Sequence, residues 1–388
     1  MNNNQTRIIS IDIFRGITML LMIFVNDFWT LSGIPLWLEH AKADQDFLGF
    51  SDIIFPCFLF IVGMSIPYAI RNRLKKGENQ LKILKHIILR SLALLVMGYF
   101  TVNIGHLNVI ASGISREVFE IIMTIAFFLI WNIYPKTETW KKYLYVGLQV
   151  FGILILIALY LVFRGGKDGT GSMSHSWWGI LGLIGWTYLI TSTIYLFANK
   201  SQLLLIFTWV LFTMLNIADQ AHWFRTIIPG GGAFEGFAFA GILATLVNDR
   251  AGSSDQKRKL PFIYLSAGIL MIIAGFGLRN FFIISKIHAT PTWVFLCNGI
   301  ALGVFGFVYL VADLYGKAKW FNFLKPAGSS TLTCYLIPYI YYSLATFAFT
   351  LPTFIKTGIP GLFKSFVYAL IIIGITEFLG RIKIKLKI

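Results

Sequence analysis

The sequence predicts an all-α, polytopic membrane protein with about twelve transmembrane helices, arranged as a single domain over residues 1–388. Of the 388 residues, 57% are hydrophobic and only 13% are charged, which is too few to cover a water-facing surface of this size. Runs of about twenty apolar residues, each long enough to cross a bilayer, recur from end to end. These runs do not alternate as barrel strands do, and a helix satisfies its own backbone in lipid, so we expect helices.

Twelve apolar runs define the expected helices. In chain order they cover residues 11–31, 50–70, 82–102, 116–134, 142–163, 177–197, 201–218, 231–248, 260–279, 290–314, 326–350 and 361–380. The first run is too long to be the apolar part of a cleavable signal peptide, so we expect it to remain as a helix. Polar residues interrupt the pattern around the seventh and eighth runs, where Asp219, His222, Arg225 and Glu235 lie.

Positive charge orients these helices. With the N-terminus inside, 22 of the 33 lysine and arginine residues fall on the inner side and 9 on the outer side, while Arg15 and Arg90 lie within runs. This bias places both termini in the cytoplasm, and we expect a multi-pass protein of a bacterial inner membrane. Because the basic residues flank apolar runs, the net charge of +16 indicates membrane orientation and no nucleic-acid partner.

The first run contains polar residues that are costly in lipid and usually face a cavity or a partner. Arg15 and Asn26 are eleven residues apart, so they share one face of a helix at a separation of about 16 Å. Asp12 lies one turn before Arg15 and can pair with it. The alternative is a simple interfacial ion pair, in which Arg15 extends toward the headgroups.

A histidine and a carboxylate flank the start of the second run, on the outer side. His40 is the only histidine in the loop between the first two runs, and Asp52 begins the helix that follows. A carboxylate in this place can hold an imidazole in one tautomer and orientation. The alternative is an exposed loop histidine without a role.

Other charged residues are candidates for binding. Arg7 and Arg90 lie on the inner side, whereas Glu235 follows three glycines and Lys286 precedes the tenth run on the outer side. Glycine runs let a ligand approach the backbone, although they serve equally as turns. The three cysteines lie within apolar runs without metal-ligand spacing, so we expect no metal site.

Several short motifs occur in a characteristic order. They are Ser10–Gly16, Phe24–Asn26, His40–Ala41, and Asp52–Pro56 followed by Phe58–Gly63. Together they resemble the opening of the heparan-α-glucosaminide N-acetyltransferase family, whose bacterial members often carry a domain-of-unknown-function label. Fainter similarities follow at Phe234–Gly236, Ser285–Lys286, Thr290–Trp293 and Gly328–Tyr335, so that the resemblance covers about half of the chain.

The chain also departs from that family pattern. Ser330 stands where asparagine is common, and Lys42 and Ala43 replace a serine–tryptophan pair in a longer loop. Residues 11–134 carry the main motifs, residues 177–218 resemble a two-helix insertion relative to the lysosomal enzyme, and residues 231–388 form the C-terminal helices. These departures affect the expected acceptor sugar more than the expected chemistry.

The resemblance implies transfer of acetyl from cytosolic acetyl-CoA to the amine of a glucosamine-type sugar in the periplasm, with His40 catalytic and Asn26 beside it. Arg7, Arg15 and Arg90 would hold the nucleotide phosphates, with Asp12 beside Arg15. Asn26 would donate a hydrogen bond to the developing oxyanion. His40 would take the amine proton, and Asp52 would orient it. Glu235 and Lys286 are the candidates for contacts with the sugar.

Three alternatives stay open at this stage. The acetyl group can pass through a covalent acetyl-histidine instead of moving directly. The chain can be an O-acyltransferase of glycans, or a twelve-helix solute transporter, although no repeat of its halves is visible. The oligomeric state is also open, and a homodimer is compatible with the family.

Overall fold

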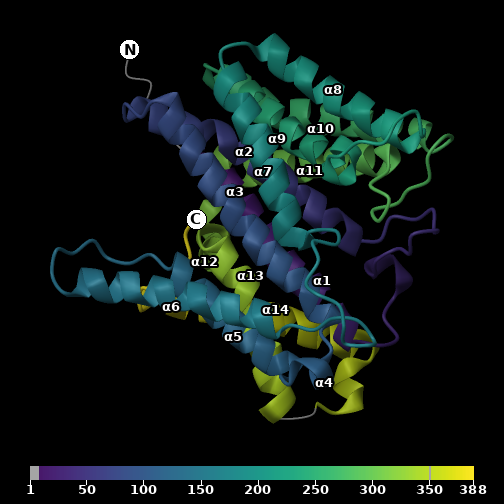
Figure 1. Cartoon of the computed structure of the whole chain (residues 1–388). Coiled ribbons are helices and arrows are strands. Elements are labelled where there is room, and N and C mark those ends of the chain that lie inside the picture. The colour runs from purple at the N-terminus through teal and green to yellow at the C-terminus, as the bar shows by residue number, and fades with distance from the viewer. Residues whose placement is uncertain (1–7, 349–350) are drawn as a thin grey trace.

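The computed structural model describes residues 8–348 and 351–388, which form helices joined by loops (Figure 1). Residues 349–350 and the predicted phosphate ligand Arg7 lie outside the described residues. The α-helices are α1 (Ile9–Asn26), α2 (Ser51–Lys75), α3 (Gln80–Asn103), α4 (Val109–Ser112), α5 (Arg116–Trp131), α6 (Lys141–Val162), α7 (Gly179–Ala198), α8 (Gln202–Gln220), α9 (Ala233–Arg250), α10 (Ser254–Leu278), α11 (Pro291–Tyr309), α12 (Lys325–Ser329), α13 (Thr331–Ala348) and α14 (Gly358–Arg381).

Ten helices in the described part of the chain are long and apolar enough to cross a membrane, which makes this a multi-pass membrane protein. They are α1–α3, α6–α11 and α14. The other two predicted runs also form helices, because α5 lies within 116–134 and α12 and α13 occupy 326–348. The prediction of an all-α fold is confirmed, whereas twelve crossings and cytoplasmic termini stay predictions.

Helix α1 packs against α2 and α11 and against the C-terminal helices α12, α13 and α14. Helices α8 to α11 lie together in the upper part of Figure 1, and α5, α6 and α14 lie in the lower part. Helix α2 packs antiparallel to α1, because Arg15 near the start of α1 donates to Ser65 in the second half of α2. Loop residues 27–50 therefore lie at the opposite end of this pair from the basic segment that follows α2.

Glycines allow the central helices to approach closely. A Cβ atom on Gly63 of α2 would lie 1.9 Å from the carbonyl oxygen of Ala238, and one on Gly241 of α9 would lie 2.0 Å from that of Phe60. Lipid is as apolar as the helices themselves, so close contact between backbones stabilises such interfaces. The motif that ends at Gly63 thus fixes α2 against α9.

Charged groups anchor both ends of α1. At its start, the Asp313 carboxylate accepts hydrogen bonds from the backbone N–H groups of Ile9 and Ser10, at 3.3 and 3.0 Å. Just beyond its end, Asp27 is 1% exposed and forms an ion pair with Lys364 at 2.5 Å. The hydroxyls of Tyr342 and Ser365 also donate to Asp27, each at 2.6 Å. Helix α1 is therefore fixed to α13 and α14.

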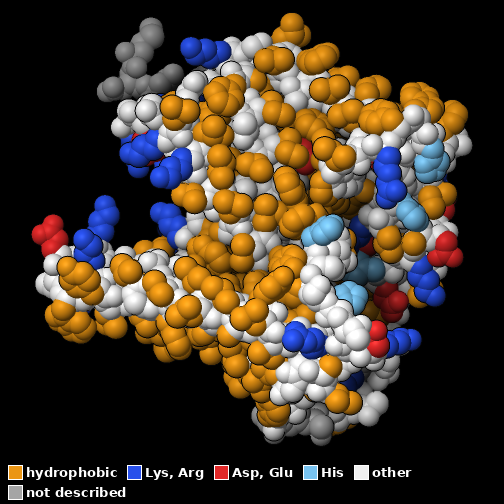
Figure 2. Space-filling view, in the orientation of Figure 1, with side chains coloured by type: hydrophobic (Ala, Val, Ile, Leu, Met, Phe, Trp, Pro, Cys, Tyr) orange, Lys and Arg blue, Asp and Glu red, His pale blue; other side chains and the backbone are white. Residues whose placement is uncertain are grey.

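Apolar side chains cover most of the face seen in Figure 2, as expected for a surface in contact with lipid. Lysine and arginine side chains lie on the left of this view, near the start of α1 and at the free end of α6, and further ones lie on the right among acidic and histidine side chains. Charged groups therefore lie at both sides of a broad apolar surface on this face.

Candidate active site

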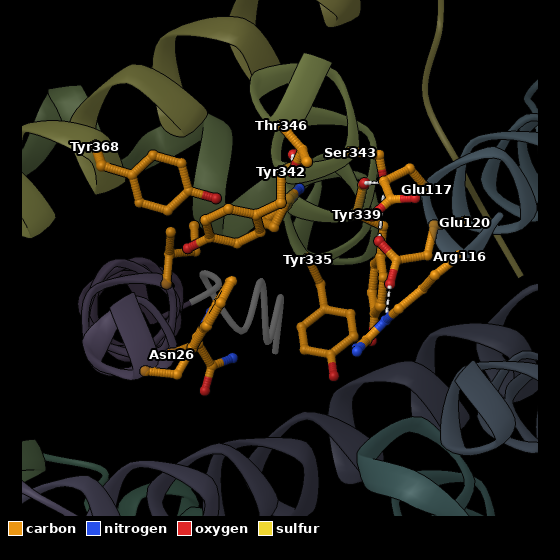
Figure 3. Close-up of a pocket in the computed structure, with 13 residues that line it drawn as sticks. Asn26, Arg116, Glu117, Glu120, Tyr335, Tyr339, Tyr342, Ser343, Thr346 and Tyr368 are labelled. Atoms are coloured by element: carbon orange, nitrogen blue, oxygen red, sulfur yellow. Dashed lines mark hydrogen bonds and ion pairs between the residues drawn. The ribbon is translucent and has the colours of Figure 1, made fainter. Parts of the chain in front are cut away.

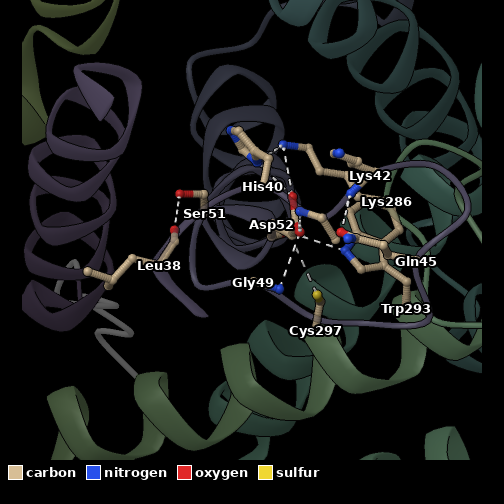
Figure 4. Close-up of polar contacts among 11 residues, drawn as sticks. Leu38, His40, Lys42, Gln45, Gly49, Ser51, Asp52, Lys286, Trp293 and Cys297 are labelled. Atoms are coloured by element: carbon tan, nitrogen blue, oxygen red, sulfur yellow. Dashed lines mark hydrogen bonds and ion pairs between the residues drawn. The ribbon is translucent and has the colours of Figure 1, made fainter. Parts of the chain in front are cut away.

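His40 and Asp52 form a close pair where the loop between α1 and α2 meets α2 (Figure 4). The His40 Nδ1 atom lies 2.7 Å from Oδ1 of Asp52, and the His40 side chain is 50% exposed whereas that of Asp52 is 1% exposed. A carboxylate accepts a hydrogen bond from the N–H of the facing imidazole nitrogen, which leaves the Nε2 lone pair available to another group. The predicted contact between these two residues is present.

The Asp52 carboxylate is fixed by the backbone around it. Its Oδ2 atom accepts hydrogen bonds from the N–H groups of Ala41 at 3.0 Å and Gly49 at 3.3 Å. A Cβ atom on Gly49 would lie 1.8 Å from the carbonyl oxygen of Glu39, so this turn requires glycine. The Trp293 indole N–H donates to the Asp52 carbonyl oxygen at 3.1 Å and ties α11 to the start of α2.

Lys286 completes this cluster from the loop between α10 and α11. Its Nζ atom lies 3.6 Å from Oδ1 of Asp52 and 3.2 Å from Nδ1 of His40. Because Nδ1 faces the Asp52 carboxylate, Lys286 acts on this pair through its charge. Burial lowers the pKa of the Lys286 ammonium below its ordinary value, and the charge of Asp52 opposes this change.

The loop that carries His40 is also bound to the segment that carries Lys286. The Asp46 carboxylate accepts from the backbone N–H of Ile284 at 2.7 Å and from Arg279 Nε at 2.8 Å. These contacts, with the backbone N–H contributing most, hold the pKa of Asp46 below its ordinary value. The Ser285 hydroxyl donates to the Ala43 carbonyl at 3.2 Å. The two loops thus form one unit, and the sequence had assigned no role to Asp46.

A basic cavity of about 480 Å³, here called the inner cavity, borders α1 from Arg15 to Met22. Its walls include Arg15 and Arg90 together with Lys385 and Lys387 near the end of the chain. The Arg15 guanidinium pairs with Asp12 at 3.1 Å, as predicted, and that of Arg90 lies 4.5 Å from the ring centre of Tyr188. The structure therefore brings Asp12, Arg15 and Arg90 together at one end of α1 and α2.

The C-terminal residues 385–388 line this cavity, a contact that the sequence did not predict. The backbone N–H of Leu386 donates to Thr333 Oγ1 at 3.0 Å, and that of Lys387 donates to the Trp131 carbonyl at 3.0 Å. These contacts hold the segment against α5 and α13. In the sequence, the only sign of this contact is the cluster of basic residues at 381–387, which also indicates the orientation of the helices.

A second cavity of about 430 Å³, here called the outer cavity, contains Asn26 in its wall (Figure 3). Tyrosines from α13 and α14 surround it, and Arg116, Glu117 and Glu120 from α5 form the opposite side. Tyr335 belongs to the walls of both the inner and the outer cavity. The two cavities therefore follow α1 from Arg15 to Asn26.

Two predicted site residues lie apart from His40. Among the described residues, no hydrogen bond links Asn26 to the His40 cluster, although Asn26 ends α1 and Asp52 begins α2 at the same end of this antiparallel pair. Glu235 is 1% exposed at the start of α9, and its Oε2 atom has no hydrogen-bond partner in the described part of the chain. The structure thus gathers His40, Asp52 and Lys286, and leaves Glu235 outside this cluster.

Comparison with known proteins relates this geometry to a family. The chain is 34% identical over 102 residues to "Heparan-alpha-glucosaminide N-acetyltransferase" of Mus musculus, a match that covers 26% of this chain and 15% of the relative. It is 37% identical over 98 residues to the Homo sapiens protein of the same name, covering 25% of this chain and 14% of the relative. The matches thus span about one seventh of these relatives.

A family model described as "Domain of unknown function (DUF5009)" matches residues 7–247, which is more than half of the chain. This range includes α1, α2, the His40 loop and the start of α9. Both findings agree with the resemblance predicted from the motifs at Ser10–Gly16 and Asp52–Pro56. The chain therefore belongs to the DUF5009 family and is related to the heparan-alpha-glucosaminide N-acetyltransferases.

Proposed function

We propose that this protein is a membrane N-acetyltransferase, which takes acetyl from acetyl-CoA on the cytoplasmic side and transfers it to an amino sugar on the periplasmic side. One observation supports this more than any other. Asp52 begins α2 beside His40, whereas the basic inner cavity reaches Ser65 and Ala69, which lie about 20–25 Å further along this helix. A transferase that acts across a membrane needs this separation between its donor entrance and its acceptor group.

The inner cavity fits the chemistry of acetyl-CoA. Arg15, Arg90, Lys385 and Lys387 offer positive charge for the phosphates of the nucleotide end, where charge-assisted hydrogen bonds are strongest. Apolar residues including Met19, Met22 and Phe58 line the rest of this wall and suit the uncharged arm. A donor held in this way would point its thioester along α1 toward Asn26. Arg7 stays a proposed further phosphate ligand.

The proposed reaction forms a bond between the amine nitrogen and the carbonyl carbon, and breaks the bond between that carbon and the thiol sulfur. His40 Nε2 accepts the proton that the amine loses, and then supplies it to the departing thiolate. Asp52 keeps the imidazole in the required tautomer and stabilises its protonated form. The Asn26 amide donates to the oxygen that becomes negative during the attack.

This proposal retains twelve crossings with both termini in the cytoplasm, in a bacterial inner membrane. In that orientation, the loop with His40 lies in the periplasm and the basic segment after α2 lies in the cytoplasm. Direct transfer is favoured over an acetyl-histidine, because the two cavities follow α1 over most of its length. Lys286 would contact the acceptor from beside the pair, whereas the buried Glu235 stays a weaker candidate.

The test uses purified protein, labelled acetyl-CoA and a panel of amino sugars. We expect labelled N-acetyl sugar from the native protein and none from His40→Ala. If acetyl-labelled protein accumulates when no acceptor is present, transfer proceeds through a covalent acetyl-histidine and is not direct. Absence of product with every amine, together with uptake of a solute into vesicles without acetyl-CoA, would contradict the proposal.

A further inference from the structure

The outer cavity carries chemistry that the proposed reaction does not by itself explain. Besides Asn26, its wall contains Trp29, four tyrosines, two glutamates and one arginine. The four tyrosines are Tyr335, Tyr339, Tyr342 and Tyr368, and the charged residues are Arg116, Glu117 and Glu120. Aromatic faces combined with carboxylates are suited to a ligand that is both ring-shaped and cationic.

We propose that the outer cavity is the acceptor site and that it selects a cationic amino sugar without acidic substituents over a sulfated glycan end. This inference rests on the proposed acetyl transfer, because it names the acceptor of that reaction. It concerns residues far from the His40 cluster in the sequence, and it makes a prediction about which amines react.

The charge of the cavity is the first reason. Arg116 Nε lies 3.1 Å from Oε1 of Glu120, and the Ser343 hydroxyl donates to Oε2 of the same carboxylate at 2.8 Å. The only basic side chain of the wall is thus paired with Glu120, and Glu117 leaves the wall with a net negative charge. In a protein of net charge +16, a negative cavity at this place favours a cation and repels sulfate.

The aromatic groups are the second reason. The rings of Trp29 and Tyr342 lie 5.4 Å apart at an angle of 67°, so two ring systems border the same space. An ammonium group is attracted to such faces, and the apolar face of a sugar ring can pack on them. Tyr368 contributes a further ring to this wall, with its centroid 5.3 Å from that of Tyr342.

The cavity wall is also preorganised. Tyr342 donates to the buried Asp27 carboxylate at 2.6 Å, and Asp27 in turn pairs with Lys364. A wall that is fixed before binding loses little entropy when a ligand enters. Because Asp27 follows Asn26 directly, the same network fixes the amide that we place beside the thioester. Asn26 therefore belongs both to this cavity and to the proposed donor path. In the proposed reaction the sugar binds as a cation, and its amine attacks the thioester after His40 has taken its proton.

The experiment compares two acceptors and one ligand that cannot react, with native protein in detergent at neutral pH. D-Glucosamine is the cationic probe, a sulfated glucosamine disaccharide is the acidic one, and N-acetylglucosamine is a neutral ligand that cannot react. We expect higher kcat/KM for glucosamine than for the sulfated disaccharide. Glucosamine should also change the tryptophan fluorescence of the native protein, and this change should be absent from the Trp29→Phe variant.

The Glu117→Gln variant tests the charge, and Glu138→Gln, on the exposed loop before α6, is its control. Loss of one charged contact should raise the KM for glucosamine roughly tenfold without lowering kcat. The preference for glucosamine over the sulfated disaccharide should fall by a similar factor. A Glu120→Gln variant is measured second, because Glu120 also holds Arg116 and Ser343.

Failure of this inference is distinguishable from failure of the proposed function. Faster transfer to the sulfated disaccharide, unchanged by Glu117→Gln, would overturn the acceptor assignment while acetyl transfer stands. Glucosamine binding that depends on Trp29 and Glu117, without any transfer, would overturn the transferase and keep the cavity as an amino-sugar site. If glucosamine neither binds nor is acetylated, both the acceptor assignment and the proposed acetyl transfer are contradicted.

Discussion

The Nδ1 atom of His40 and the Oδ1 atom of Asp52 lie 2.7 Å apart, although one residue belongs to an exposed loop and the other is buried at the start of a helix. The buried carboxylate determines which imidazole nitrogen carries the proton, because only Nδ1 faces it. The exposed half of the ring is then free to act on a ligand.

Replacing His40 by alanine should remove acetyl transfer and preserve donor binding. Loss of a general base lowers kcat by about a hundredfold to about ten-thousandfold. Steady-state transfer to glucosamine and equilibrium binding of acetyl-CoA are measured on the same preparation. His106→Ala, which alters an exposed histidine of another loop, is the matched control. Normal turnover of His40→Ala would end its catalytic assignment.

The charge of Lys286 should set the alkaline limit of activity. Its pKa is lowered by burial, so the ammonium loses its proton below pH 10.5, the ordinary lysine value, and the cation beside Asp52 disappears as the pH rises. We expect kcat/KM to fall in this alkaline range. Because arginine stays protonated, Lys286→Arg should move the limit to higher pH. Identical profiles for the two proteins would mean that another group causes the decline.

Removing either arginine of the inner cavity should weaken donor binding. A hydrogen bond to a charged group contributes about 1.5–3 kcal/mol, so Arg15→Ala and Arg90→Ala should each raise the Kd for acetyl-CoA about tenfold or more. Calorimetric titration in detergent measures this. Arg258→Ala, on the exposed start of α10, should leave the Kd unchanged. Native affinity in both cavity variants would place the phosphates elsewhere.

The buried pair of Asp27 and Lys364 should contribute to stability. Breaking a buried pair by removing one partner costs about 3–5 kcal/mol, so Asp27→Asn should lower the midpoint of thermal unfolding in detergent. Glu377→Gln breaks the exposed pair with Arg381 and should cost less than about 1 kcal/mol. Equal midpoints for the two variants would show that the Asp27 network contributes little. Adding Lys364→Met to Asp27→Asn should restore part of the loss.

The helices were largely predictable, because an apolar run in lipid must satisfy its backbone internally whatever its neighbours are. The ends of two runs were not. The run 116–134 ends as a helix at Trp131, because the next residues bond to the C-terminal segment, with Ile133 N–H donating to Lys385 at 2.9 Å. The run 326–350 is interrupted at Ser330, where the preceding Gly328 packs against the backbone of Asp12. Both features arise from distant contacts.

In the candidate site too, contacts between residues close in the sequence were predictable, whereas contacts between distant residues were not. Pairing of Asp12 with Arg15 and of His40 with Asp52 could be predicted, because three and twelve residues separate the partners. Asp27 was missed, since its partners Tyr342 and Ser365 lie 315 and 338 residues away. Glu120 was missed for a similar reason, because Ser343 belongs to a distant helix. No local pattern marks a buried carboxylate whose partners come from the other end of the chain.

The ring of Tyr335 borders the inner cavity on one side and the outer cavity on the other. In the proposed orientation these cavities open toward opposite faces of the bilayer, and Tyr335 is the residue that their walls share in the described part of the chain. A protein built in this way has to admit an acyl group while keeping ions and protons from leaking down their gradients. The size of the Tyr335 side chain therefore affects both the passage of the acyl group and the leakage of ions across the membrane.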